Sequence, residues 1–246
     1  MIKRFFLMTL FIGICTVYVS AKDETEYRKE LYDLYISGKM ADWQPVLSEM
    51  LVDKSVSSKE ARIRLLTDYY GLIGHLIDKK CKEEASAALK SAWKLEKALE
   101  NSYPGDAKIL ALKGNLVGFQ IAMSPLKATT MASGMLGDVK KAYAKAPGDA
   151  LVNILYGNIR FYMPGMFGGD KTEALSCYKK ARKTMEADSS ALKNNWLYVQ
   201  LLVTIGLVYE KDEQYAKAKE MYAWVIKHYP AYAYVKETLY PRVKDK

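Results

Sequence analysis

The stretch LLVTIGLVYEKDEQYAKAKEMYAWVIKHYP, residues 201–230, places apolar residues at the spacing of two amphipathic helices. One face of the first helix carries Leu202, Ile205, Gly206 and Tyr209, and one face of the second carries Ala218, Tyr222 and Val225. Gly206 and Ala218 are small, so the two helices can pack closely while aromatic side chains fill the space beside them. Pro230 ends the second helix. The stretch therefore predicts an antiparallel helix pair.

This pattern of small and large residues resembles the tetratricopeptide repeat almost position by position, with Val225 standing where the family usually has alanine. The resemblance implies an all-α fold, a right-handed superhelix of stacked antiparallel helix pairs. Such arrays bind other molecules on the surface that the stacked pairs create.

Upstream, a turn motif followed by a glycine occurs twice, 43 residues apart. Pro104-Gly105-Asp106-Ala107 is followed, ten residues after its proline, by Gly114, and Pro147-Gly148-Asp149-Ala150 is followed at the same distance by Gly157. Each glycine lies in an apolar helical stretch, where a neighbouring helix can approach closely. The residues expected to pack the pairs are Gly114, Gly157, Ala174, Tyr178, Ala181, Gly206, Tyr209, Ala218, Tyr222 and Pro230.

Two connections are longer than the repeat pattern requires. Five extra residues form a loop around 163–169, and we expect a longer loop over 124–137 followed by a shortened helix. Upstream, the apolar spacing and the turn signals predict helices over 24–36, 42–52, 60–77 and 83–100. No stretch alternates with period two for long enough to demand a sheet. The prediction is therefore an all-α chain with about ten helices.

The first 21 residues have the three parts of a secretory signal. Lys3 and Arg4 are followed by an apolar run and by small residues before an expected cleavage after Ala21. The alternative is an uncleaved anchor, but the run is shorter than the ~20 residues that a spanning helix needs. We expect an exported protein, periplasmic or extracellular. The expected organisation is a signal peptide at 1–21 and a repeat domain at 22–246, with irregular pairs at 22–103, units at 104–146, 147–188 and 189–230, and a tail at 231–246.

The mature chain is mildly basic. Removing Lys3 and Arg4 from the 37 basic residues leaves 35 against 28 acidic ones, a net charge of +7. Such a charge favours an acidic partner or an anionic membrane surface, unless the lysines only form solvated helix faces. We expect no nucleic-acid partner, because no basic block is interleaved with aromatic residues. We also expect no stable membrane insertion, because no second apolar stretch is long enough.

The residues that could carry chemistry are few. The segment GMFGGDKT, residues 165–172, departs from a phosphate-binding P-loop at Asp170, where that loop needs glycine. We expect Asp170 to cap the next helix, with Glu173 completing a capping box. His75 and His228 are each isolated from other metal ligands, and no nucleophile elbow occurs. We therefore expect a protein that is not an enzyme and that uses no cofactor or metal.

A candidate partner surface follows from the two expanded loops. The apolar residues in or beside them are Met123, Met131, Met135, Met163, Met166 and Phe167. Successive loops of a solenoid line up on one edge, so these residues should adjoin. Adaptable methionine side chains would suit a protein or peptide partner. The alternative is that the loops fold back to cover core between imperfect repeats.

A second resemblance concerns the middle third of the chain. Leu136-Gly137-Asp138, Gly157, the run from Pro164 to Asp170, Ala174 and Ala181 resemble the periplasmic tetratricopeptide-like accessory proteins, or T components, of TRAP transporters. That resemblance implies an oligomeric accessory protein that hands on or senses a small ligand beside a substrate-binding protein. The function that we expect first is a non-catalytic scaffold for protein–protein interaction, and a homo-oligomer is one form that it could take. The TRAP accessory role is the alternative.

Overall fold

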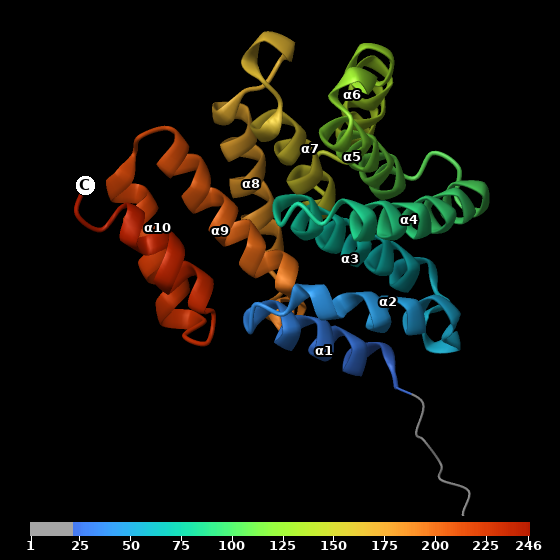
Figure 1. Ribbon diagram of the computed structural model, residues 1–246, viewed down its shortest axis with the longest axis horizontal. Helices are drawn as coiled ribbons and strands as arrows, with labels where there is room; N and C mark the ends of the chain where they lie inside the picture. The colour runs from blue at the N-terminus through green and yellow to red at the C-terminus, as the bar shows by residue number, and fades with distance from the viewer. Residues whose placement is uncertain (1–21) are drawn as a thin grey trace, which may run out of the picture.

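The computed structural model describes residues 22–246, and the expected signal peptide at 1–21 lies outside the described residues (Figure 1). The described part contains no strand. Its α-helices are α1 (Glu24–Ile36), α2 (Trp43–Val52), α3 (Lys59–Asp78), α4 (Lys82–Ser102), α5 (Ala107–Met123), α6 (Ala128–Lys145), α7 (Ala150–Tyr162), α8 (Lys171–Glu186), α9 (Trp196–Lys211) and α10 (Tyr215–His228). This confirms an all-α fold with about ten helices. The first four predicted helices match their observed bounds to within two residues.

Short helical turns connect or follow the long helices. They are η1 (Met40–Asp42), η2 (Lys54–Val56), η3 (Pro125–Lys127), η4 (Gly165–Phe167), η5 (Ser189–Leu192), η6 (Val235–Leu239) and η7 (Tyr240–Arg242). No helix within residues 22–246 is both long and apolar enough to cross a membrane.

Consecutive helices pack as pairs, and the closest pairs join α3 to α4, α5 to α6, α7 to α8 and α9 to α10. Glycine makes the approach possible in the last two. A Cβ added to Gly157 would lie 2.7 Å from the ring of Tyr178, and one added to Gly206 would overlap the ring of Tyr222. The five extra residues between α7 and α8 lie in their connecting loop. The same glycine–tyrosine contact therefore forms in both units despite the insertion.

The other residues expected at pair interfaces lie as follows. In the α5–α6 pair, a Cβ on Gly114 would overlap the side chain of Val139. The side chains without exposed surface include Ala174, Ala181 and Ala218, and Tyr209 is also buried. Pro230 is exposed, two residues after α10 ends at His228.

The predicted loop over 124–137 is wrong, because α6 already begins at Ala128. Met135, Val139 and Ala142 recur at helical spacing and are buried in the interior. Two glycines in this stretch suggest a loop, but a Cβ at Gly134 or Gly137 would meet nothing within 4 Å. These glycines lie on the open side of the helix. Their only effect is a lower helix propensity, and the packing of the apolar side outweighs it.

The capping box expected at the start of α8 forms only in part. Asp170 caps the helix by accepting a hydrogen bond of 2.9 Å from the amide of Glu173. The backbone amide of Asp170, which a capping box would use, instead donates to the carbonyl of Arg160. The Glu173 carboxylate accepts a hydrogen bond from Tyr156 and forms an ion pair with Arg160. The reciprocal half of the prediction is therefore wrong, because Arg160 occupies both groups.

The first helices of the described chain contact its last part. In Figure 1, α1 and α2 cross the base of the molecule, where the lower end of α9 reaches them. Tyr35 on α1 donates a hydrogen bond of 2.8 Å to Gln200 on α9 and accepts one from Tyr232. The indole of Trp196 on α9 donates at 2.7 Å to Asp68 on α3. We call Tyr35, Asp68, Trp196, Gln200 and Tyr232 the closure contact.

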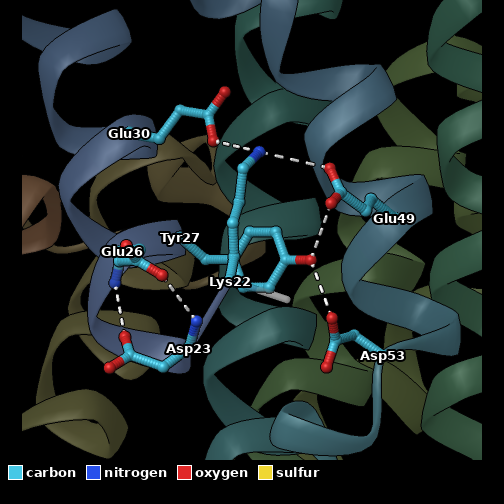
Figure 2. A network of polar contacts seen from close by, with 7 residues as sticks. All are labelled: Lys22, Asp23, Glu26, Tyr27, Glu30, Glu49 and Asp53. Carbon is cyan, nitrogen blue, oxygen red and sulfur yellow. Dashed lines mark hydrogen bonds and ion pairs between the residues drawn. The ribbon is translucent and has the colours of Figure 1, made fainter. Parts of the chain in front are cut away.

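A second polar network ties α1 to α2 at the start of the described chain (Figure 2). The hydroxyl of Tyr27 lies 3.0 Å from a carboxylate oxygen of Glu49 and 3.0 Å from one of Asp53. The ammonium of Lys22 lies 2.9 Å from Glu30 and 3.3 Å from Glu49. Burial and these acceptors raise the pKa of Tyr27. The first residue of the expected mature chain is thus held by both helices of the first pair.

Candidate functional site

The residues of the expected partner surface lie in different environments. Met135 is 6% exposed, and its sulfur would lie 3.6 Å from a Cβ on Gly118 of α5, so it belongs to the α5–α6 interface. Met166 and Phe167, on the turn between α7 and α8, are 85% and 61% exposed. Met123, Met131 and Met163 are half-buried. Because Met135 is interior, the six residues do not form one exposed surface.

Met123 instead lines a groove between two successive helix pairs. The groove has a volume of about 590 Å³ and lies between α4 and the end of α5 with its following turn. Its lining residues are Ser86, Leu89, Lys90, Trp93, Lys94, Lys97, Gln120, Met123, Ser124 and Lys127. We call this feature the lysine groove.

The helical repeat of α4 builds one wall of the lysine groove. Lys90, Lys94 and Lys97 are four and three residues apart, so they lie along one side of the helix. Leu89 and Trp93, also four residues apart, lie beside them and pack on the core. Leu89 is only 7% exposed and Trp93 is half-buried, whereas the three lysines are exposed. The wall therefore has an apolar base and a cationic rim.

The end of α5 builds the opposite wall. Met123 is the last residue of α5, and it packs against the core. Ser124 then leaves the helical conformation, and the turn η3 that follows it carries Lys127 at its end. The apolar side chain of Met123 and the ammonium of Lys127 therefore line the groove on the side opposite Trp93. The groove has a lysine rim on both sides of an apolar base.

The lysine groove concentrates charge of one sign. None of its four lysines forms an ion pair within residues 22–246, and no acidic side chain lines it. Lys113, earlier on α5, shows the contrast, because its ammonium lies 2.8 Å from Glu100. The indole N–H of Trp93 is buried and has no hydrogen-bond partner in the described chain. The groove therefore suits a ligand that has both apolar surface and negative charge.

A smaller hollow on α8 is also basic. It has a volume of about 390 Å³ and is lined by Lys179, Arg182, Lys183, Glu186 and Ala187. Glu186 lies within its lining, 2.7 Å from Arg182 and 2.7 Å from the hydroxyl of Tyr198. These partners lower the pKa of the Glu186 carboxyl against the effect of its burial. Part of the positive charge there is already paired, and the hollow has no large apolar side chain.

The histidines lie apart from the lysine groove. His75 on α3 is half-buried, and burial lowers its pKa. His228 is the last residue of α10, where its ring stacks on Trp224 at 3.8 Å. Among residues 22–246, no three His, Cys, Asp or Glu side chains gather closely enough to hold a metal ion.

Sequence reasoning treated the lysines among glutamates as solvated helix faces and so missed the lysine groove. One signal was present, since Lys90, Lys94 and Lys97 flank Trp93 at helical spacing. The second wall was not readable, because Met123 and Lys127 reach Trp93 only through the packing of α4 on α5.

Comparison with known proteins gives little further guidance. No family model matches the chain, and no curated protein matches it. A similar solved structure is that of the HusA haemophore from Porphyromonas gingivalis, with 18% sequence identity over 78% of this chain and 96% of that chain. Its TM-score is 0.48, a likeness too weak to carry an argument about function.

Proposed function

We propose that this protein is an exported, non-catalytic helical scaffold of the tetratricopeptide-like kind, which binds a protein or peptide partner in the lysine groove. The observation that carries the proposal is the groove itself, with an apolar base and four lysines that lack ion pairs within the described chain. The groove is formed by two successive helix pairs, and proteins built from stacked helix pairs use the extended surfaces that the stacking creates to bind partners.

The partner is tested by site-specific photo-crosslinking in the organism's own cells. Benzoylphenylalanine replaces Met123 in the groove and, as a matched control, Val52, which is exposed at the end of α2. We expect position 123 to form an adduct with another protein, identified by mass spectrometry, and position 52 to form none. The Lys90→Glu/Lys94→Glu variant should lose the adduct. Equal adducts at both positions, or none at 123 in a folded protein, would contradict the proposal.

The same experiment addresses the TRAP accessory alternative that the middle third of the chain suggests. A substrate-binding protein captured at position 123 would support that role. Any other protein captured there would support the general scaffold and not the transporter.

Export rests on the sequence features of residues 1–21, and it has its own test. We expect mass spectrometry of the protein isolated from cells to give a chain that begins at Lys22, outside the cytoplasm. A chain that retains Met1, or one found only in the cytoplasm, would contradict this part of the proposal.

A further inference from the structure

We infer that the lysine groove accepts an acidic amphipathic helix of the partner, with an apolar stripe bordered by carboxylates on both sides. This inference rests on the proposed function and names the class of segment that the groove recognises. It follows from the arrangement of charge, the spacing of the lysines and the depth at which the apolar side chains lie.

The charge arrangement requires negative charge on two sides of the ligand. Lys90, Lys94 and Lys97 stand on the α4 wall, and Lys127 stands on the wall formed by α5 and η3. No carboxylate lines the groove, so none of the four charges is neutralised within it. Like charges gathered around a low-dielectric base repel one another and are stabilised when an anionic surface covers them.

The spacing of the α4 lysines matches the repeat of a helix. Four and three residues along α4 correspond to rises of about 6.0 and 4.5 Å. A second helix laid along α4 presents carboxylates at i, i+4 and i+7 with the same rises. An extended strand presents alternate side chains every ~6.6 Å, so three of them span ~13 Å, against ~10.5 Å between Lys90 and Lys97. The helix therefore fits all three lysines in register, as in helix-in-groove recognition.

The apolar base makes a small anion a poor occupant. Leu89 and Met123 pack on the core beside Trp93, and together they offer apolar surface below the lysine rim. An inorganic anion would leave that surface in water, whereas Leu, Ile or Phe side chains at i, i+3 and i+7 of a helix would cover it. A flat anionic bilayer would meet the exposed lysines first and leave the recessed Leu89 uncovered.

The inference is tested by selecting ligands from a displayed library of helical peptides with twelve randomised positions, using the purified chain from residue 22 to 246. We expect the recovered peptides to carry Asp or Glu on both sides of an apolar stripe. We expect Lys90→Glu/Lys94→Glu to weaken their binding by tenfold or more. Lys140→Glu/Lys141→Glu, an equal change of charge on two exposed α6 lysines that form no ion pair in the described chain, should change it less than twofold.

Several outcomes would overturn the inference. The recovered peptides could lack an excess of acidic residues, or their affinity could be the same for Lys90→Glu/Lys94→Glu as for the wild-type protein. Either result, or a failure to recover any peptide, would overturn it. Binding of vesicles rich in phosphatidylglycerol, with no peptide recovered, would assign the groove to a membrane surface instead. A protein crosslinked at position 123 together with non-acidic peptides would leave the scaffold function standing and refute only the helix. Acidic peptides without any crosslinked protein would refute the scaffold function.

Discussion

Single glycines decide how closely the helices of this protein can approach. Gly157 and Gly206 each face a tyrosine ring on the partner helix, and neither Tyr178 nor Tyr222 has exposed surface into which it could move. Gly134 on α6 faces open space. Glycine is therefore required for packing at Gly157 and Gly206. At Gly134 it only destabilises the helix, and a larger residue could replace it.

Replacing these glycines with alanine should move stability in opposite directions. Gly206→Ala should lower the free energy of unfolding by at least about 1 kcal/mol, because overlap with Tyr222 outweighs the gain in helix propensity. Gly134→Ala should raise it by about 0.5–1 kcal/mol. Urea denaturation measures both. A Gly206→Ala variant as stable as the wild-type protein, or more stable, would show that the glycine–tyrosine contact does not limit the approach of α9 and α10.

Asp68 should make stability fall as the pH rises. Burial raises the pKa of its carboxyl from 3.8 to about 7, although the bond from Trp196 opposes this. The folded protein then binds a proton that the unfolded chain releases between pH 4 and 7. The unfolding free energy should fall across that window by up to about 1.4 kcal/mol per pH unit from this group.

Asp68→Asn should remove this part of the slope while keeping an acceptor for Trp196. Burial also raises the pKa of Glu96 to about 7, so this group too makes the unfolding free energy fall as the pH rises. The double variant Asp68→Asn/Glu96→Gln should therefore depend on pH less than Asp68→Asn does. Thermal unfolding at pH 4, 5.5 and 7 measures the slope. If the stability of Asp68→Asn changes with pH as steeply as that of the wild-type protein, Asp68 is ionised in the folded state over the whole range from pH 4 to 7.

At the scale of the element, α6 shows which sequence signals can mislead. Gly134 and Gly137 favoured a loop, but Met135, Val139 and Ala142 provided the spacing that the structure follows. For helices with strong apolar periodicity, such as those of the first two pairs, the predicted bounds match the observed ones to within two residues. The lysine groove could be predicted only on its α4 side, because the other side depends on which helices become neighbours.

The methionines of α6 and of the α7–α8 turn should contribute differently to the free energy of unfolding. Met166→Ser/Phe167→Ser should change the unfolding free energy by no more than about 0.5 kcal/mol, because both side chains are exposed. Met135→Ala should cost about 2–5 kcal/mol, because its side chain is buried against α5. Chemical denaturation of the two variants measures the difference. A large loss from the double serine variant would show that the turn covers core.

At the scale of the whole molecule, the closure contact makes the described array more than a row of neighbouring repeats. Tyr35 and Gln200 are 165 residues apart in the sequence, yet their side chains are hydrogen-bonded. The repeat pattern alone predicts contacts only between adjacent units, so it gave no indication of this closure. Closure depends on which distant helices become neighbours in the fold, and no local motif specifies that.

Breaking the closure contact should loosen one region before the rest. Tyr35→Ala should cost about 3–5 kcal/mol by analogy with other buried aromatic truncations. It should speed amide hydrogen exchange in α1 and α2 more than in α5 to α8, as measured by mass spectrometry. Tyr103→Ala, at a partly exposed tyrosine outside the contact, is the control. Uniform loss of protection along the chain would instead show a single cooperative unit.

The distance that the closure contact spans also sets an order of events during biosynthesis. The chain is synthesised from its N-terminus, so the part of α1 that contacts α9 and Tyr232 has no partner until those residues have also been made. The early pairs can form locally, but the final structure can be completed only when nearly the whole chain is free. A chain that ends before residue 196 therefore leaves Tyr35 without its partners on α9 and at residue 232.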